Sequence, residues 1–162
     1  MMKIRIGLGL DFHRLVPARR LVLGGVDIAF ERGLLGHSDA DVLSHAIADA
    51  LLGAAGRGDL GKHFPDDDPR YENISSLELL ARVKLLLDQQ HYRIANIDAT
   101  LVAERPRLAK YFPQMRENIA QALGIGPGQL NLKATRPEGL GALGRSEGIA
   151  AQAIALLKRA AK

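Results

Sequence analysis

Three residues of the sequence carry side chains that commonly bind metal ions, at spacings that could bring them together. Asp11 and His13 lie two residues apart at the end of an alternating segment, and residues i and i+2 of an extended chain point to one side. His45 lies in a segment of helical periodicity, four residues from both Asp41 and Asp49. Ligation by Asp11, His13 and His45 would leave a fourth tetrahedral position open, as in catalytic zinc sites. The alternative is a helix histidine solvated by two carboxylates.

A candidate phosphate site precedes the same helix. Gly36-His37-Ser38-Asp39 stands where free backbone N–H groups and the positive end of a helix dipole favour phosphate oxygens. His37 and Ser38 would add side-chain donors. The alternative interpretation is ordinary N-capping by Ser38, with His37 exposed.

Residues 58–69 form an acidic loop that follows the helix. Asp59, Asp66, Asp67 and Asp68 lie within it. Such acids could accept sugar hydroxyls, bind a hard divalent cation, or solvate a turn. The loop is long, and long loops are often functional.

A basic segment near the C-terminus could meet an anionic ligand. Lys133, Arg136 and Arg145 supply positive charge around Glu138, which could bind a metal ion between phosphates. The glycines between residues 139 and 144 permit tight turns, but their spacing matches neither a Walker loop nor a dinucleotide-binding fingerprint.

The elements that must position these residues follow from periodicity and turn residues. Alternation over residues 3–10 predicts a strand that ends at Asp11, and further strands are predicted over residues 21–23, 26–30, 92–103 and 129–135. Helical spacing predicts helices over residues 38–55, 75–90, 108–123 and 146–160. Gly24-Gly25 suits a hairpin turn, and Ser38 with Asp41 suits a capping box. The predicted fold is α/β (α+β-like), a mixed four-stranded sheet with helices packed on one face.

Composition narrows the class of protein. A chain of 162 residues fits one domain, residues 1–162, and the absence of cysteine leaves His, Asp and Glu as metal ligands. Its 22 Lys and Arg are spread among 18 acids, and only 4% of residues are aromatic, which argues against nucleic acid as a partner. No apolar run predicts a signal peptide or a membrane span, so we expect a cytoplasmic protein without a membrane partner.

Six segments together resemble the 2-C-methyl-D-erythritol 2,4-cyclodiphosphate synthase family, from about residue 3 to residue 158. They are GLDFHRL (9–15), HSDADV (37–42), HAIADALLGAA (45–55), GDLG (58–61), FPD (64–66) and GRSEGI (144–149). Each segment is weak evidence by itself, but their order along the chain makes the resemblance specific.

The resemblance implies an enzyme of the non-mevalonate isoprenoid pathway, a phosphorus-oxygen lyase. The 2-phosphate of 4-diphosphocytidyl-2-C-methyl-D-erythritol 2-phosphate would attack the β-phosphorus, giving the cyclodiphosphate and CMP. The implied metal ligands are Asp11, His13 and His45 for one zinc ion per subunit, and Glu138 for magnesium or manganese bound with the substrate. The implied assembly is a homotrimer with active sites between subunits.

Positions that match the family's motifs give the expected substrate contacts. His37 and Arg136 are the expected transition-state stabilisers. The expected substrate-binding residues are His37, Ser38, Asp59, Leu60, Gly61, Phe64, Pro65, Asp66, Asp67, Asp68, Ala103, Glu104, Arg105, Pro106, Arg107, Leu108, Ala109, Ala134, Thr135, Arg136, Pro137, Glu138, Ala142 and Arg145. Residues 103–109 with Ala134 and Thr135 would form the cytidine pocket. Asp49 would either orient His45 or solvate its helix.

The chain also departs from the family's pattern. Arg136-Pro137 replaces two threonines, Ala142 replaces a bulky residue near the trimer axis, and Arg107 replaces the usual lysine. Two other functions stay open. A zinc-dependent phosphoesterase would use the same ligands to activate water, and a phosphate-binding module would hold a structural metal.

Overall fold

A computed structural model describes residues 3–159 and contains a mixed five-stranded sheet. The strand order is β4-β1-β7-β5-β6, and only β5 and β6 pair in parallel. The strands are β1 (Lys3–Pro17), β4 (Arg32–Leu34), β5 (Tyr92–Val102), β6 (Leu130–Thr135) and β7 (Gly148–Arg159). The predicted α/β class is confirmed, but the count of four strands is wrong. A single domain over residues 1–162 stays a prediction, and its two ends lie outside the described residues.

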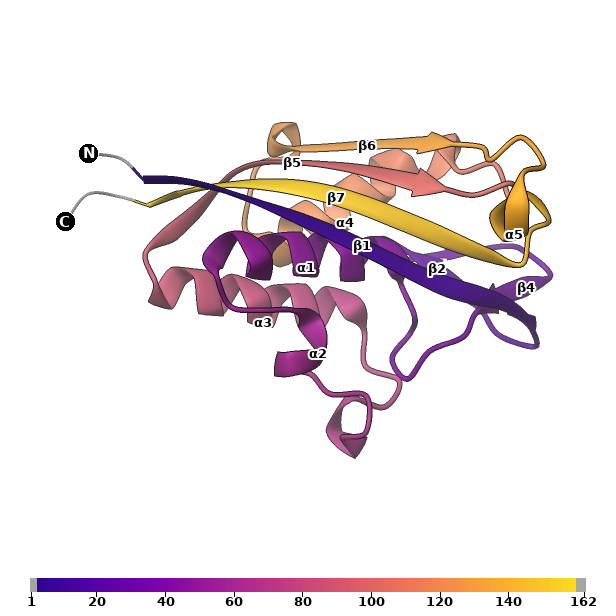
Figure 1. The fold of residues 1–162 in the computed structure, drawn as a ribbon, viewed down its shortest axis with the longest axis horizontal. Coiled ribbons are helices and arrows are strands. Elements are labelled where there is room, and N and C mark those ends of the chain that lie inside the picture. Colours follow the sequence, from indigo (N-terminus) through magenta and orange to yellow (C-terminus); the bar gives the residue numbers. More distant parts are fainter. Residues whose placement is uncertain (1–2, 160–162) are drawn as a thin grey trace.

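Helices cover one face of this sheet (Figure 1). The long ones are α1 (Val42–Ala55), α3 (Ser76–Gln89) and α4 (Phe112–Leu123), and the short ones are α2 (Leu60–His63) and α5 (Gly141–Gly144). Short 3-10 turns span Pro69–Tyr71, Ala109–Tyr111 and Pro127–Gln129. A separate hairpin pairs β2 (Leu21–Leu23) with β3 (Val26–Ile28) through Gly24 and Gly25, both at positive φ as predicted for the turn.

The predicted closing helix over residues 146–160 is a strand. β7 lies between β1 and β5 at the centre of the sheet, and the predicted end at Ala160 lies outside the described residues. Its alanines favour a helix locally, but helix propensity is a weak preference that tertiary contacts override. A period of two was present: Ala151, Ala153 and Ala155 are buried, whereas Gln152 and Ile154 between them are exposed.

Two other predicted boundaries move. β1 continues past the expected end at Asp11 as far as Pro17, because its second half pairs with both β7 and β4. α1 begins at Val42 rather than Ser38, because Asp41 is the N-cap and its carboxylate accepts the N–H of Ser44 at 3.1 Å.

Two glycines let α1 lie directly on β1. A side chain at Gly7 or Gly9 would collide with backbone atoms of Ala50 and Ala46, respectively, in α1. The strand alternation that turns these glycines toward the helix turns Asp11 and His13 the same way. The close approach therefore brings both side chains to the first turn of α1.

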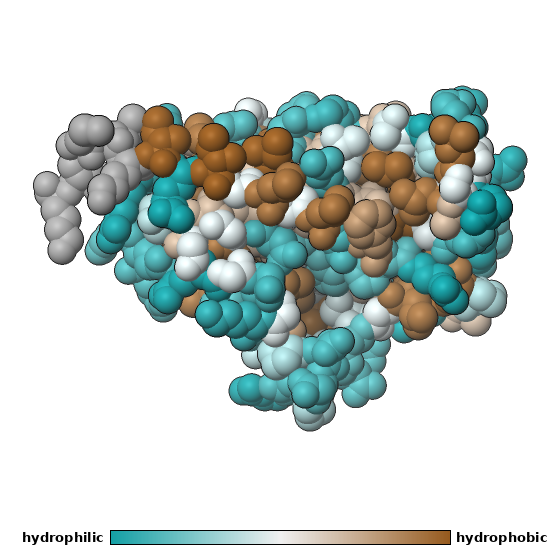
Figure 2. Space-filling model, in the orientation of Figure 1, coloured by the Kyte–Doolittle hydropathy of each residue, from teal (hydrophilic) through white to brown (hydrophobic). Residues whose placement is uncertain are grey.

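The opposite face of the sheet is apolar and exposed. Ile4, Ile6, Leu8, Leu10 and Phe12 of β1 are each more than half exposed. Figure 2 shows brown side chains in a row that follows β1 across the molecule. We call these five residues the β1 apolar row. Among the described residues, no helix has the length and apolar character to cross a membrane.

Candidate active site

Asp11, His13 and His45 converge. The Asp11 Oδ2 atom lies 3.0 Å from His13 Nε2 and 3.1 Å from His45 Nδ1, and the two nitrogens are 3.2 Å apart. β1 supplies the first two residues and α1 the third. The convergence that spacing alone could not establish is therefore present.

The other nitrogen of each histidine is occupied. His13 Nδ1 lies 2.6 Å from the carbonyl oxygen of Leu35, which can only accept, so Nδ1 carries the proton. His45 Nε2 lies 2.9 Å from the hydroxyl of Ser76 and 3.1 Å from that of Ser38. Partners behind the rings are the usual way in which metal-binding histidines are oriented.

The pKa values of Asp11 and His13 are shifted in opposite directions. Burial by itself raises the pKa of the Asp11 carboxyl, but hydrogen bonds and charge from His13 and His45 lower that pKa well below its usual range. Burial lowers the pKa of His13, yet the hydrogen bond and the charge of Asp11 outweigh it, and the pKa is raised above 6.5. The carboxylate is thus a permanent anion at neutral pH.

The three ligand atoms fit a tetrahedral zinc ion. Ligands about 2.0 Å from zinc in tetrahedral geometry lie about 3.3 Å from one another, and the distances here are 3.0, 3.1 and 3.2 Å. Two imidazoles and one carboxylate suit zinc better than magnesium or calcium, which prefer oxygen ligands. No fourth protein ligand belongs to the cluster found among the described residues.

The cluster lies in the wall of a cavity of about 550 Å³. The lining also includes His37, Ser38, Asp59, Leu60, Gly61, Phe64 and Asp66. His37 Nε2 donates to the carbonyl oxygen of Asp68 at 3.1 Å, which ties the segment before α1 to the acidic loop. Metal ligands, a helix start and an acidic loop therefore share one cavity.

Comparison with known proteins identifies the family. A family model described as YgbB family matches residues 4–158. The chain belongs to the YgbB family. Relatives named 2-C-methyl-D-erythritol 2,4-cyclodiphosphate synthase include one from Geotalea uraniireducens, 60% identical over 96% of this chain and 99% of the relative, and one from Clostridium perfringens, 59% identical over 95% and 99%. The family and the enzyme class predicted from the sequence are confirmed.

Solved structures that are similar to this chain support the same family assignment. The bifunctional IspDF from Campylobacter jejuni matches with a TM-score of 0.95 and 39% identity over 99% of this chain, which spans 43% of that longer protein. The Plasmodium falciparum IspF, a CDP complex, matches with a TM-score of 0.85 and 33% identity over 98% of this chain and 97% of that one. The described fold is therefore that of the family.

Four of the expected cytidine-pocket residues lie apart from the metal cluster: Glu104, Arg105, Pro106 and Arg107. Phe30, Glu104, Arg105, Pro106, Arg107 and Arg136 line a separate hollow of about 390 Å³. Within the described chain, none of them lines the metal-site cavity. Within a single chain, the metal-site cavity and the hollow beside residues 104–107 are therefore two separate spaces.

Arg136 is engaged by an acid. Its guanidinium donates to Glu104 Oε1 through Nε at 3.1 Å and also through Nη2, and Glu104 Oε2 accepts the N–H of Gly139. The hydrogen bond and charge of Arg136 lower the pKa of Glu104. The ion pair joins the end of β5 to the segment after β6, and the predicted phosphate role of Arg136 stays untested.

Three of the expected site residues near the C-terminus, Glu138, Ala142 and Arg145, lie outside the metal-site cavity. Glu138 is exposed, with φ at +54°, in the turn before α5. Ala142 is an exposed residue of α5, and Arg145 donates through Nε to Glu147 at 2.6 Å. Their expected roles stay predictions.

Several acids have structural partners. Asp41 is buried and accepts the N–H of Gly25 at 2.9 Å, so it does not join His45. Asp49 faces the metal-site cavity, where it accepts the N–H of Leu60 at 2.7 Å instead of contacting the His45 ring. Asp68 accepts hydrogen bonds from Arg70, and these bonds lower the pKa of the Asp68 carboxyl to about 2.

Two residues that lie behind His45, Ser76 and Asp39, are not among the predicted site residues. In the sequence, Ser76 lies only within the predicted helix over residues 75–90, and Asp39 only in the segment before the first predicted helix. The structure places the Ser76 hydroxyl between His45 and the Asp39 carboxylate. No periodicity connects residues 39, 45 and 76, so no local pattern could have found this contact.

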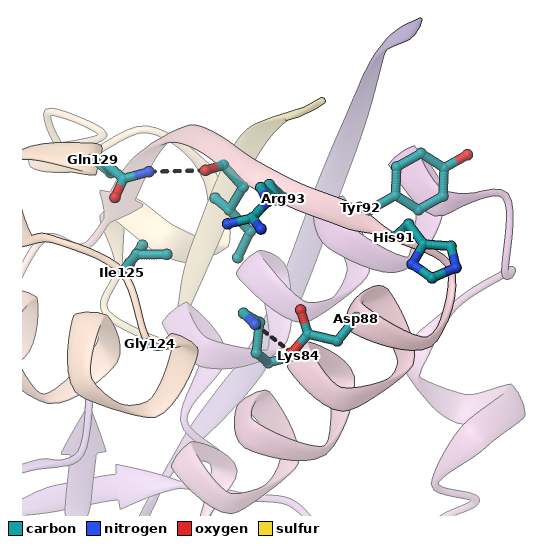
Figure 3. Close-up of a pocket in the computed structure, with 9 residues that line it drawn as sticks. Lys84, Asp88, His91, Tyr92, Arg93, Gly124, Ile125 and Gln129 are labelled. Atoms are coloured by element: carbon teal, nitrogen blue, oxygen red, sulfur yellow. Dashed lines mark hydrogen bonds and ion pairs between the residues drawn. The ribbon is translucent and has the colours of Figure 1, made fainter. Parts of the chain in front are cut away.

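Another hollow, of about 440 Å³, lies between α3, α4 and the start of β5 (Figure 3). Its lining includes Lys84, Asp88, Arg93 and Gln129. Lys84 is paired with Asp88 at 2.5 Å, and the Gln129 amide donates to the carbonyl oxygen of Ile94 at 2.8 Å. None of the predicted site residues lines it.

Proposed function

We propose that this chain converts 4-diphosphocytidyl-2-C-methyl-D-erythritol 2-phosphate to 2-C-methyl-D-erythritol 2,4-cyclodiphosphate and CMP. The observation that carries the proposal is the convergence of Asp11, His13 and His45 in a cavity shared with His37 and the acidic loop. The similar Plasmodium falciparum IspF, a CDP complex, supports a cytidine diphosphate ligand. The cytoplasmic location predicted from the sequence is kept as a prediction.

Asp11, His13 and His45 would hold one zinc ion, and Glu138 would hold a magnesium or manganese ion with the substrate. These cations would supply charge neutralisation for phosphate groups that must approach one another. Both reacting groups belong to the substrate: its 2-phosphate oxygen forms a bond to the β-phosphorus, and the bond from that phosphorus to the CMP oxygen breaks. The protein therefore needs no nucleophile of its own.

The remaining side chains would bind and orient the substrate. His37 and Ser38 border the zinc ligands and would donate hydrogen bonds to phosphate oxygens. Asp59 and Asp66 line the same cavity and would accept hydroxyls of the erythritol. The hollow beside Arg105 and Arg107 would take the cytidine end of the molecule.

The active unit we propose is a homotrimer with sites between subunits. The metal-site cavity and the proposed cytidine hollow are separate within one chain, so a neighbouring subunit would have to bring them together. The β1 apolar row provides a face for such contacts, since apolar side chains that stay exposed in a monomer are costly. The number three comes from the family resemblance.

Turnover of the cytidine substrate tests the proposal. We expect CMP and the cyclic diphosphate as products, with no oxygen incorporated from heavy-oxygen water. A linear product that contains solvent oxygen would instead identify a zinc-dependent phosphoesterase. Tight substrate binding without CMP release would identify a binding module.

A matched pair of histidine variants links the activity to the cluster. His45→Ala should lose zinc and reduce CMP release to background, because three ligands become two, while the fold is retained. His91→Asn is the control, since His91 is exposed outside the metal-site cavity and its φ of +59° is one that asparagine tolerates. Zinc content and thermal unfolding should be measured on both. A fully active, zinc-loaded His45→Ala variant would contradict the ligand assignment.

A further inference from the structure

A buried hydroxyl and a carboxylate lie in line behind His45. Ser76, which begins α3 and is 1% exposed, has its Oγ atom 2.9 Å from His45 Nε2. The same hydroxyl donates to Asp39 Oδ1, and the N–H of Ser76 donates to Asp39 Oδ2 at 2.9 Å. Asp39 Oδ1 also accepts the N–H of Asp41 at 3.2 Å. The carboxylate is thus fixed by backbone donors from the starts of two helices.

The proton positions follow from the partners. A carboxylate oxygen accepts, so the single hydroxyl proton of Ser76 points at Asp39. The Ser76 oxygen then has only lone pairs to offer the ring, and His45 must carry its proton on Nε2. His45 Nδ1 faces Asp11 Oδ2 at 3.1 Å and His13 Nε2 at 3.2 Å. In the metal-free chain a proton on Nδ1 would be donated to the Asp11 carboxylate, and a metal ion bound there would take the place of that proton.

We propose that Ser76, backed by Asp39, is a positioning residue that holds His45 in the Nε2–H tautomer and aims its Nδ1 lone pair at the metal. The inference rests on the zinc site proposed above. It extends that site to α3, so a residue distant in sequence from the three ligands sets how tightly they bind.

The arrangement also assigns separate roles to two hydroxyls. Ser38 Oγ lies 3.1 Å from the same His45 nitrogen and accepts the N–H of Ala40 at 3.2 Å. Among the described residues, Ser38 Oγ has no carboxylate partner, whereas Ser76 Oγ has one. With the His45 proton directed to Ser76, Ser38 can donate its own proton into the cavity, toward a substrate phosphate.

A capping role would not explain this geometry. The N-cap position of α3 is Ser75, and the Ser76 hydroxyl points to a side chain of another segment. Ser44 offers a matched control, because its hydroxyl is equally buried and also donates to a carboxylate, that of Asp41 at 2.8 Å. Ser44 adjoins His45 in sequence and makes no hydrogen bond to its ring.

Zinc affinity, measured by competition with a chromophoric chelator, tests the proposal on the full chain. Ser76→Ala should weaken zinc binding by about 10-fold to 100-fold, the usual effect of losing a partner behind a metal-binding histidine. Ser76→Thr keeps the hydroxyl and should restore most of the affinity. Ser44→Ala should bind zinc as the parent protein does, although it loses thermal stability.

Nitrogen NMR of the metal-stripped protein gives a second readout, independent of the variants' stability. The parent protein should show a proton on His45 Nε2, and Ser76→Ala should leave that nitrogen partly unprotonated. A parent protein that binds no zinc would overturn the proposed metal site itself. Normal zinc affinity in Ser76→Ala, equal weakening in Ser44→Ala, or an unprotonated His45 Nε2 in the parent would overturn the positioning role while leaving the site in place.

Discussion

At the scale of single residues, His13 is set between an anion and a carbonyl oxygen. The hydrogen bond and the charge of Asp11 hold its pKa above 6.5 against the effect of burial, and the Leu35 carbonyl adds to the rise. Zinc needs the neutral ring, so the metal must displace a proton that the metal-free cluster retains. Binding and protonation therefore compete at this residue.

Zinc affinity should consequently depend on pH with a definite sign. A raised pKa leaves His13 protonated over more of the neutral range, so we expect affinity to fall as the pH drops from about 8 to about 6. Calorimetry in buffers of different ionisation enthalpy should detect proton release on binding. An affinity that stays flat over this range, with no proton release, would contradict the competition.

Arg136 is the residue at which the chain leaves its family's pattern. We expect Arg136→Ala to lower turnover by roughly tenfold, the scale of one charge-assisted hydrogen bond to phosphate. Its unfolding free energy should change by about 1 kcal/mol or less, because the Arg136 side chain is 53% exposed, although that of Glu104 is only 12% exposed. Steady-state kinetics with zinc content checked would measure both effects.

Glu104→Gln is the matched control for Arg136. It keeps the guanidinium and an oxygen acceptor, so the loss of turnover should be smaller than in Arg136→Ala, although Glu104 itself lies in the expected cytidine pocket. If both variants turn over normally, Arg136 lies outside the chemistry. An equal loss in both would mean that the ion pair shapes the loop and that neither side chain meets phosphate.

At the scale of elements, the contact between β1 and α1 brings together the residues of the proposed metal site. The strand's glycines allow the helix to approach, and only at that separation does His45 reach Asp11 and His13. α1 in turn lies against α3, which brings Ser76 behind His45. The site is thus formed where three elements meet.

Gly9→Ala should push these elements apart. Its added carbon would meet the carbonyl oxygen of Ala46, which cannot move without shifting α1, so we expect a loss of about 1 to 3 kcal/mol in unfolding free energy together with weaker zinc binding. Gly53→Ala is the control. The nearest atom to its added carbon is 3.9 Å away, and alanine favours the helix by about 1 kcal/mol. Equal effects of the two variants would disprove the close-approach explanation.

At the scale of the whole molecule, one face of the sheet is left uncovered by the chain's own helices (Figures 1 and 2). The β1 apolar row lies on this face together with Ile154 of β7. We attribute the row to contact with other copies of the chain, as in the proposed trimer. Assembly and activity should then be lost together.

Leu8→Asp should convert the proposed trimer to monomer, because a carboxylate would be buried at a subunit contact. CMP release should fall to background while zinc binding is retained, since Leu8 points away from the metal ligands. Leu85→Asp is the control: Leu85 of α3 is 61% exposed and Leu8 59%, yet Leu85 lies outside the sheet face. Light scattering would measure the mass. An active monomeric Leu8→Asp variant would refute the trimer.

The sequence alone determined the residue types of the candidate metal site, the hairpin turn and most element positions. It also carried the family resemblance, because ordered motifs are a property of the chain itself. Local information sufficed wherever neighbouring residues decide the conformation, as at Gly24-Gly25 or along α4.

Only the tertiary structure shows that residues 148–159 form a strand and that Asp41, Asp49 and His45 have different partners. It also shows that Ser76 contacts the proposed metal site. Each depends on partners far along the chain: β7 is held by β1 and β5, and His45 is reached from residues 11, 13 and 76. Alanine-rich β7 favours a helix by local propensity, and pairing on both sides outweighs that preference. Long-range contacts leave no local pattern in the sequence, and this is why spacing alone could not reveal them.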